Sequence, residues 1–341
     1  MAFRPAVWYN GNGNMCSDID QQDGGIPLSG RTYTFMDTRR TLNRVRAPSM
    51  PFERSLNPYR GCAHGCSFCY ARAFHPYLGL GANDEFQNRI LIKRNAPEAL
   101  EAELRAAVRR YGGRSAAIRN IGEVAVGTAT DPYQPVEAQA RITRECLKIL
   151  ARYGVPVTIT TRSPLILRDL DILKEMNLLA VNISVNTMDH RLMRLLEPAS
   201  PHPAKRMEAV AALNDAGVPA GIFLAPILPF LTDTAETLEE ICAAAKGSRA
   251  EFVMPSLLRL APDVRAWYLS VLARHFPRLV GRYAALYRGA YPDPGEAGRI
   301  LERARLIIAR HGLNERPGSR NPSGSTAEPE AEQICFPFGQ P

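Results

Sequence analysis

The middle of the chain alternates short apolar runs with longer stretches of helical periodicity. The apolar runs, rich in β-branched residues, predict strands at 123–130, 155–161, 179–186, 218–225 and 250–257. Stretches with apolar residues three and four positions apart predict helices at 140–154, 169–176, 203–217 and 233–247. Gly154, Gly217 and Gly247 stand where three of these helices are expected to end.

Strands that alternate with helices predict βαβ units and a parallel sheet. One more strand before Gly61 gives about six units, fewer than the eight of a full barrel. Both ends of the chain depart from the pattern. We expect an irregular leader over residues 1–50, an α/β core over 51–275 and a helical extension over 276–314. Pro, Ser, Gly and Glu dominate residues 315–341, which predicts a disordered tail.

Arginine supplies nearly all of the positive charge. The formal net charge is +8, and 37 of the 42 Lys and Arg residues are arginine. A GC-rich genome is one explanation of this bias, and selection for bidentate phosphate contacts is the other. The basic residues are spread along the sequence without runs, so the charge supports nucleic-acid binding only weakly.

The seven cysteines predict a metal or redox site and not a disulfide framework. Their number is odd, and three of them fall within eight residues. The amino-terminal sequence lacks the apolar stretch of a signal peptide, and no apolar run is long enough for a transmembrane helix. We therefore expect a cytoplasmic protein without a membrane partner, and disulfides are rare in that compartment.

The three clustered cysteines lie in the segment NPYRGCAHGCSFCYAR, where Cys62, Cys66 and Cys69 have the spacing Cys-x3-Cys-x2-Cys. A glycine-containing loop of this kind lets three thiolates converge on one metal centre. A closed iron–sulfur cluster and a structural zinc ion each require four ligands, and the next cysteine, Cys146, is expected inside a helix. Three thiolates therefore leave one iron of a cluster open. Zinc bound by the three cysteines and His64, or three unbound thiols, are the alternatives.

This segment resembles the radical S-adenosylmethionine enzymes, in which three cysteines hold a [4Fe–4S] cluster and the open iron binds the methionine moiety of the cofactor. The resemblance implies a partial (β/α)6 TIM-type barrel and reductive cleavage of S-adenosylmethionine to a 5′-deoxyadenosyl radical. Over roughly residues 50–280 the chain is similar to the spore photoproduct lyase-like branch. The motifs that carry this similarity are NPYRGCAHGCSFCYAR, VGTATDPYQPVE, TRSPLILRDLDIL, NISVNTMDHRLMRLLEP and VPAGIFLAPILP.

The branch implies roles for residues beyond the cysteines. Its strand-end hydroxyl and lysine side chains hold the cofactor, and the matching positions are Thr130, Arg162 and Ser184, with arginine in place of lysine. Tyr70 follows the last cysteine, where the branch has a tyrosine that assists radical transfer. Tyr133 is expected to line the site and to stack on adenine or a substrate base. For both tyrosines, simple packing is the alternative.

Thr128 marks a departure from the branch. True spore photoproduct lyases carry a cysteine hydrogen donor three residues before the aspartate of this motif, which here is Asp131. The O–H bond of threonine is far too strong to replace that thiol, so the spore-photoproduct reaction itself is not expected. Cys335 in the tail is a remote candidate for the donor.

These features predict a lyase-like radical enzyme that acts on a DNA lesion or a nucleic-acid base. The same radical chemistry on a small molecule or a protein residue is the alternative. A third interpretation is an iron–sulfur redox or binding protein without enzymatic activity. An electron donor such as flavodoxin or ferredoxin is the expected protein partner, and DNA is the expected nucleic acid.

Overall fold

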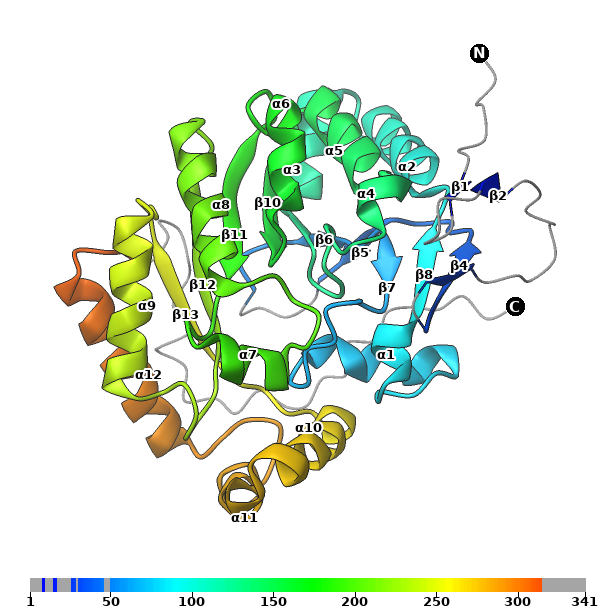
Figure 1. Cartoon of the computed structure of the whole chain (residues 1–341). Coiled ribbons are helices and arrows are strands. Elements are labelled where there is room, and N and C mark those ends of the chain that lie inside the picture. Colours follow the sequence, from blue (N-terminus) through cyan, green and yellow to red (C-terminus); the bar gives the residue numbers. More distant parts are fainter. Residues whose placement is uncertain (1–7, 10–14, 17–25, 29, 46–49, 315–341) are drawn as a thin grey trace.

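A seven-stranded sheet forms the centre of the computed structural model, which describes residues 8–9, 15–16, 26–28, 30–45 and 50–314 (Figure 1). Its strands are β5 (Leu42–Arg44), β6 (Arg54–Leu56), β9 (Val124–Val126), β10 (Val157–Thr161), β11 (Leu178–Ser184), β12 (Ala220–Ile227) and β13 (Val253–Leu257). They pair in the order β13-β12-β11-β10-β9-β6-β5. All neighbours from β6 to β13 are parallel, whereas β5 runs antiparallel to β6. The six parallel strands confirm the expected partial (β/α)6 barrel.

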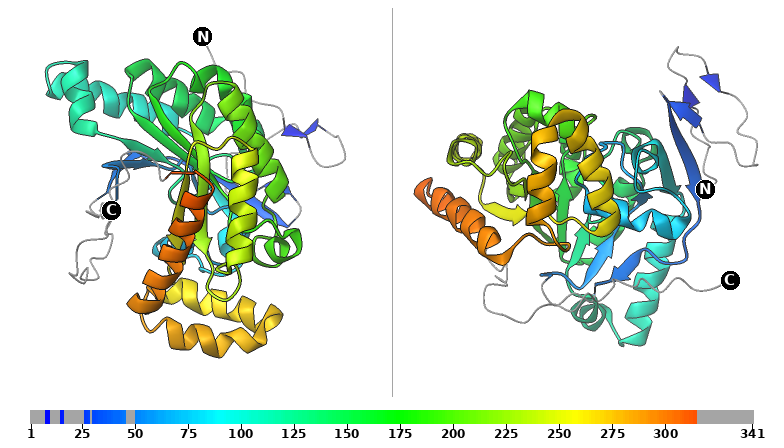
Figure 2. Two further views of the ribbon diagram at one scale, coloured as in Figure 1. Left: turned by 90° about the vertical axis from the view of Figure 1, so that its left-hand side faces the viewer. Right: turned by 90° about the horizontal axis from the view of Figure 1, so that it is seen from below.

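Helices connect the parallel strands and cover the outer face of the sheet (Figures 1 and 2). They are α2 (Ala96–Arg110), α3 (Arg114–Ile121), α5 (Ile142–Tyr153), α6 (Leu170–Leu173), α8 (Pro203–Asp215) and α9 (Ala235–Gly247). Val181 and Ile183 of β11 belong to the core cluster that includes these helices, so Asn182 and Ser184 point to the opposite, inner face. The sheet is thus apolar outside and partly polar inside.

Two expected helices differ in detail from the prediction. Within the segment 169–176 only Leu170–Leu173 form a helix, the short α6, which directly follows the 3-10 turn η3 (Pro164–Asp169). Gly154 closes α5 in the left-handed conformation, as predicted, with φ of 71°. At the end of α9, however, the left-handed residue is Arg249, with φ of 55°, and Gly247 is still helical.

The leader is not irregular where the structure describes it. The strands β1 (Trp8–Tyr9) and β2 (Met15–Cys16) pair with each other. A four-stranded sheet has the members β3 (Ile26–Leu28), β4 (Arg31–Met36), β7 (Tyr59–Arg60) and β8 (Arg89–Lys93), and β4 pairs in parallel with β8. The expectation of an irregular leader is therefore wrong for these residues. The partner of β4 is β8, which lies far along the chain, so no local sequence pattern predicts the pairing.

The carboxyl-terminal region is helical, as expected, but its helices begin earlier than residue 276. The helices α10 (Pro262–His275) and α11 (Val280–Leu286), joined by η4 (Pro277–Leu279), lie at the carboxyl-terminal end of the barrel strands (Figures 1 and 2). The last helix, α12 (Pro294–Arg310), packs on α9 and β13. The predicted disordered tail and Cys335 lie outside the described residues. Among the described helices, none has the length and apolar character to cross a bilayer.

Candidate functional site

The three clustered cysteines lie on a tight loop between β7 and the 3-10 turn η1 (Tyr70–Phe74), which we call the cysteine loop (residues 61–69). Gly61 has φ of 74°, and a Cβ there would lie 2.8 Å from the carbonyl oxygens of Phe86 and Arg89. Only glycine permits this close approach. Cys62 and Cys66 are buried, Cys69 is half-buried, and all three are free thiols. The loop thus presents three thiols at one end of the barrel.

A fully buried arginine, Arg72, holds the backbone of the cysteine loop. Its Nε donates to the carbonyl oxygen of Cys66 at 2.8 Å, and Nη2 donates to that of Gly65 at 3.0 Å. Its guanidinium lies between two rings, 4.9 Å from the centroid of Phe86 and 5.2 Å from that of Trp267 on α10. Further bonds run to the carbonyls of Ala82 and Asn83 and to the side chain of Gln87. Sequence reasoning missed Arg72, although it ends the cysteine motif.

The segment after β9 fixes the cysteine loop from the barrel side. Thr130 donates through Oγ1 to the carbonyl of Gly61 at 2.6 Å. The fully buried Gln134 donates to Thr130 Oγ1 at 3.1 Å and accepts from the amide of Ala63 at 3.0 Å. Thr130, predicted to contact the cofactor, is therefore placed where it positions the loop. Gln134 was missed, although it lies between the two prolines of the motif DPYQP.

His64 and Asp131 form a buried pair beside the thiols. His64 Nε2 lies 3.2 Å from Asp131 Oδ2, and His64 Nδ1 lies 3.3 Å from the carbonyl oxygen of Ala199. Asp131 also accepts from the hydroxyl of Thr161 and from the amide of Arg162. Burial alone would raise the pKa of Asp131, but these contacts outweigh it and hold the pKa at about 2. Both nitrogens of His64 face other groups, which removes the support for His64 as a zinc ligand.

Arg162 and Ser184 are linked through a second buried carboxylate, Glu197, which follows α7 (His190–Leu196). Arg162 Nε donates to Glu197 Oε2 at 3.1 Å, and Arg206 Nη2 donates to the same oxygen at 2.9 Å. Arg206 Nη1 also donates to the carbonyl of Ser184 at 3.0 Å. Arg206 and Glu197 are each 1% exposed. The two predicted cofactor residues thus belong to one network, and Arg206, which sequence reasoning missed, connects them.

Positive charge from Arg162 reaches the cysteine loop. Burial raises the pKa of Cys66 to about 12, and the charge of Arg162 acts in the opposite direction. Burial, Asp131 and the charges of the other two thiolates raise the pKa of Cys62 well above its usual value. The thiols are therefore close enough to influence each other, and a metal must displace their protons because the thiolate is the ligand.

Three buried acceptors near the strand ends have no hydrogen-bond partner among the described residues: Glu197 Oε1, Asn182 Oδ1 and Asn186 Oδ1. Buried acceptors are normally satisfied, so unpaired ones indicate a place for a donor that is not part of the chain. An ammonium, a ribose hydroxyl or an adenine amino group has the required chemistry, and Arg162 offers a cation for a carboxylate. The site therefore fits S-adenosylmethionine.

The thiols also fit an iron–sulfur cluster. Within the described ranges, no three Cys, His, Asp or Glu side chains are grouped closely enough to share one metal ion. In a cluster each cysteine binds a different iron, so the three thiols surround the cluster and need not meet at a single metal ion. The other cysteines with described side chains, Cys146 and Cys242, are fully buried in α5 and α9, as expected.

The structure brings two of the three predicted catalytic residues together. The hydroxyl of Tyr70 donates to the carbonyl oxygen of Thr128, and Thr128 Oγ1 accepts from Asn57 Nδ2 at 3.0 Å. The ring of Tyr70 is 43% exposed at the edge of the cysteine loop. The prediction for Tyr133 is wrong. Its ring is fully buried in the main core cluster, where it cannot stack on adenine or a base.

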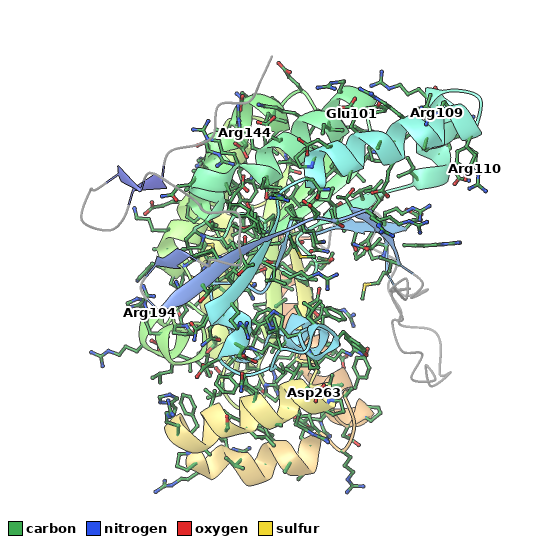
Figure 3. All side chains as sticks on the ribbon, turned by 90° about the vertical axis from the view of Figure 1, so that its right-hand side faces the viewer. Glu101, Arg109, Arg110, Arg144, Arg194 and Asp263 are labelled. Carbon is green, nitrogen blue, oxygen red and sulfur yellow. The ribbon has the colours of Figure 1, made fainter. Side chains whose placement is uncertain are left out.

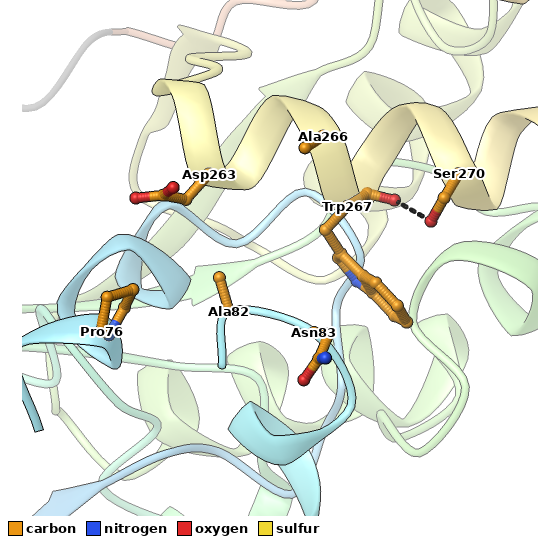
Figure 4. A pocket seen from close by; sticks show the side chains of 7 residues that line it. All are labelled: Pro76, Ala82, Asn83, Asp263, Ala266, Trp267 and Ser270. Atoms are coloured by element: carbon orange, nitrogen blue, oxygen red, sulfur yellow. Dashed lines mark hydrogen bonds between the residues drawn. The ribbon is translucent and has the colours of Figure 1, made fainter. Parts of the chain in front are cut away.

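An open pocket of about 330 Å³ lies between α10 and the 3-10 turn η2 (Pro76–Leu78) (Figure 4). The residues that line it are Pro76, Ala82, Asn83, Asp263, Ala266, Trp267 and Ser270. None of the predicted site residues is among them. Its walls are the segments that Arg72 joins, so the pocket belongs to the seam between α10 and the cysteine loop.

Comparison with known proteins agrees with this site. The family model of the radical SAM superfamily matches residues 56–245. An uncharacterized protein of Mycobacterium tuberculosis is 33% identical over 315 residues, which cover 91% of this chain and 88% of the relative. An uncharacterized protein of Methanocaldococcus jannaschii is 26% identical over 195 residues, 57% of this chain and 67% of the relative.

Solved structures share the fold at low sequence identity. Spore photoproduct lyase complexed with dinucleoside spore photoproduct superposes with a TM-score of 0.63 at 16% identity, covering 84% of this chain and 82% of that chain. A mutant of the same lyase with bound AdoMet and dinucleoside spore photoproduct gives a TM-score of 0.62 at 15% identity, with coverage of 83% and 81%. Because the family model spans more than half of the chain and the cysteine loop lies within it, this protein belongs to the radical SAM superfamily and is an enzyme that uses a [4Fe–4S] cluster and S-adenosylmethionine.

Proposed function

We propose that this protein is a lyase-like radical SAM enzyme whose substrate is a base or a lesion in nucleic acid, DNA in particular. The observation that carries the proposal is the barrel end where three free thiols, Arg162 and unpaired buried acceptors lie together. Similarity in fold to spore photoproduct lyase supports the substrate class, since that protein is described with a dinucleoside photoproduct bound.

The residues of the site divide into three roles in this proposal. Cys62, Cys66 and Cys69 hold the cluster, which together with S-adenosylmethionine supplies a 5′-deoxyadenosyl radical after one-electron reduction. Arg162 binds the carboxylate of the methionine moiety, because its side chain is still 19% exposed and only its Nε bonds to Glu197. Ser184 and the free Oε1 of Glu197 accept from the ammonium or the ribose.

Tyr70 and Thr128 form the substrate-facing edge of the site in this proposal. The exposed ring of Tyr70 is held by its bond to the Thr128 carbonyl, so its phenol is fixed beside the cysteine loop. The Thr128 hydroxyl is held by Asn57 and has no weak hydrogen to return to a carbon radical. The product-forming step therefore differs from that of a thiol-dependent lyase.

The test is anaerobic reconstitution followed by reduction and mass spectrometry of the products. We expect iron and sulfide in equal amounts, and 5′-deoxyadenosine whose yield rises when an oligonucleotide containing the right base or lesion is added. Tightly bound zinc would contradict the cluster assignment. A rise with a small molecule or a peptide, and with no oligonucleotide, would contradict the nucleic-acid substrate while leaving the cofactor chemistry intact.

Thr128→Cys sharpens the substrate assignment. If the site otherwise matches the lyases, this variant gains clean conversion of a dinucleotide photoproduct, whereas the wild-type protein gives none or gives by-products. The matched control is Thr128→Ser, which keeps the hydroxyl and gains no conversion. Efficient, clean conversion by the wild-type protein would show that another residue donates the hydrogen.

A further inference from the structure

One of the segments of the chain with an excess of positive charge is what we call the helical cap (residues 259–291). This segment contains six arginines and one aspartate, although basic residues look evenly spread along the sequence as a whole. Five of the six arginines are exposed: Arg259, Arg274, Arg278, Arg282 and Arg288. The helical cap comprises α10, η4 and α11 with their flanking residues, at the carboxyl-terminal end of the barrel.

The exposed arginines of the helical cap are uncompensated. In the part of the chain that the structure describes, none of the five lies within ion-pair distance of a carboxylate. Exposed arginines on the helices around the sheet often are paired: Arg105 and Arg152 with Glu101, and Arg310 with Glu239. Unpaired guanidinium groups in one segment create a positive potential that attracts an anionic partner.

Two of these arginines lie over aromatic rings. The guanidinium of Arg259 is 5.4 Å from the ring centroid of Tyr291, which is 59% exposed, and that of Arg282 is 3.9 Å from the ring of Phe230. An exposed ring beside a guanidinium offers a face for base stacking and a cation for a phosphate. An acidic protein surface would use the charge but would have no use for the open aromatic face.

The helical cap borders the radical SAM site. It follows directly on β13, and its Val264 and Tyr268 share a core cluster with Cys66 and Phe68 of the cysteine loop. A strand bound along the cap therefore passes the exposed edge of the cysteine loop.

We propose that the helical cap binds the sugar–phosphate backbone of the nucleic-acid strand that carries the substrate base, with its arginines on phosphates and Tyr291 stacked on a base. The proposal rests on the nucleic-acid substrate proposed above. To that function it adds the surface that binds the strand and the contacts that hold it. Guanidinium groups match phosphate oxygens with two parallel hydrogen bonds, so several phosphates are engaged at once.

Anisotropy of a labelled single-stranded oligonucleotide, titrated with reconstituted enzyme over a range of salt concentrations, tests this surface. The cap variant carries Arg274→Gln, Arg278→Gln and Arg282→Gln. The control carries Arg109→Gln, Arg110→Gln and Arg119→Gln, which remove the same charge from exposed positions on α2 and α3. Arg109 and Arg110 lie at the opposite end of the molecule from Asp263 of the cap (Figure 3).

We expect the cap variant to bind the oligonucleotide roughly tenfold more weakly at low salt. The slope of log K against the logarithm of the salt concentration should become less steep by about 2, because three contacts are lost and each phosphate contact on a single strand contributes about 0.7. The control is expected to stay within about twofold of wild type. Tyr291→Ala should weaken binding and Tyr291→Phe should not, because the phenylalanine ring keeps the stacking face. Unchanged iron content in every variant shows that the site is intact.

The outcomes separate this proposal from the substrate assignment. If the wild type cleaves S-adenosylmethionine but binds no oligonucleotide, the nucleic-acid substrate and the cap assignment fail together. If the wild type binds and the cap variant binds as tightly, or if both triple variants weaken equally, only the cap assignment fails. Slower reduction by an acidic flavodoxin with unchanged oligonucleotide affinity would assign the surface to the electron donor and overturn the proposal.

Discussion

Two buried ion networks in this protein look alike and differ in one respect. In the first, the fully buried Glu137 and Asp169 meet Arg144 and Arg168. In the second, Glu197 meets Arg162 and Arg206. Both place a buried carboxylate between two guanidinium groups. They lie in different parts of the molecule, however, and only the second adjoins the cysteine loop.

The difference lies in how many acceptors are used. Both oxygens of Glu137 accept hydrogen bonds, from Tyr59, Arg168 and the amides of Thr143 and Arg144. Both oxygens of Asp169 do so as well. Glu197 accepts only through Oε2, and its buried Oε1 has no partner in the described part of the chain. A complete network stabilises the fold, whereas an unpaired buried acceptor can accept a hydrogen bond from a ligand.

The largest effect is expected when a cysteine of the cysteine loop, which adjoins the incomplete network, is replaced. Replacing Cys62, Cys66 or Cys69 by Ala should abolish iron retention and cofactor cleavage, because two thiolates cannot hold the cluster. Iron and sulfide analysis after anaerobic desalting measures the loss. Cys242→Ala is the control, since this fully buried thiol lies in α9, and its loss of iron would show a global effect of cysteine removal.

Breaking the complete network should cost stability and leave cofactor binding unchanged. Glu137→Gln removes one of the two carboxylates that pair with Arg168, which keeps Asp169. The cost in the free energy of unfolding should therefore be at or below the value of about 3–5 kcal/mol for a buried pair that loses one member. Urea denaturation measures this change. Glu101→Gln, which breaks surface pairs, should cost about 1 kcal/mol or less. A weakened affinity for S-adenosylmethionine in folded Glu137→Gln protein would contradict the distinction.

Lowering the pH should destabilise the protein by protonating Glu197 in the incomplete network. Burial raises the pKa of Glu197, but Arg206 and Arg162 outweigh it and lower the pKa to about 2, below the ordinary glutamate value of 4.5. The contribution to stability is therefore complete above about pH 4.5 and disappears as the pH falls toward about 2. The shift corresponds to about 3 kcal/mol. Urea unfolding of the iron-free protein at several acidic pH values should show this loss, and Glu197→Gln should lack it.

A smaller effect is expected on cofactor affinity when Arg162 of the incomplete network is replaced. Arg162→Ala should raise the dissociation constant of S-adenosylmethionine roughly tenfold or more, because a charge-assisted hydrogen bond contributes about 1.5–3 kcal/mol. The change in the electron paramagnetic resonance spectrum of the reduced cluster on cofactor addition reports binding without turnover. Arg191→Ala, at an exposed position on α7, is the control. Equal affinity in Arg162→Ala protein with an intact cluster would remove Arg162 from the site.

Local sequence patterns predicted the parallel strands and the cysteine loop well. The five apolar runs became β9 to β13, and the thiols of the Cys-x3-Cys-x2-Cys motif lie on one glycine-containing loop. These features depend on neighbours within a few residues: alternation along a strand, spacing along a helix and the left-handed turn that a glycine allows. The same reasoning misplaced Tyr133, because an aromatic residue in a proline-rich loop has the same local sequence whether it faces the core or the site.

The amino-acid sequence by itself determined the order of the βα units, the cysteine loop and the candidate strand-end side chains Thr130, Arg162 and Ser184. Only the tertiary structure decided which distant groups meet them: Arg72 beneath the cysteine loop, Gln134 beside Thr130, and Arg206 between Ser184 and Glu197. The physical reason is that these buried hydrogen bonds depend on proximity in space, which long-range packing creates and no short window of sequence contains.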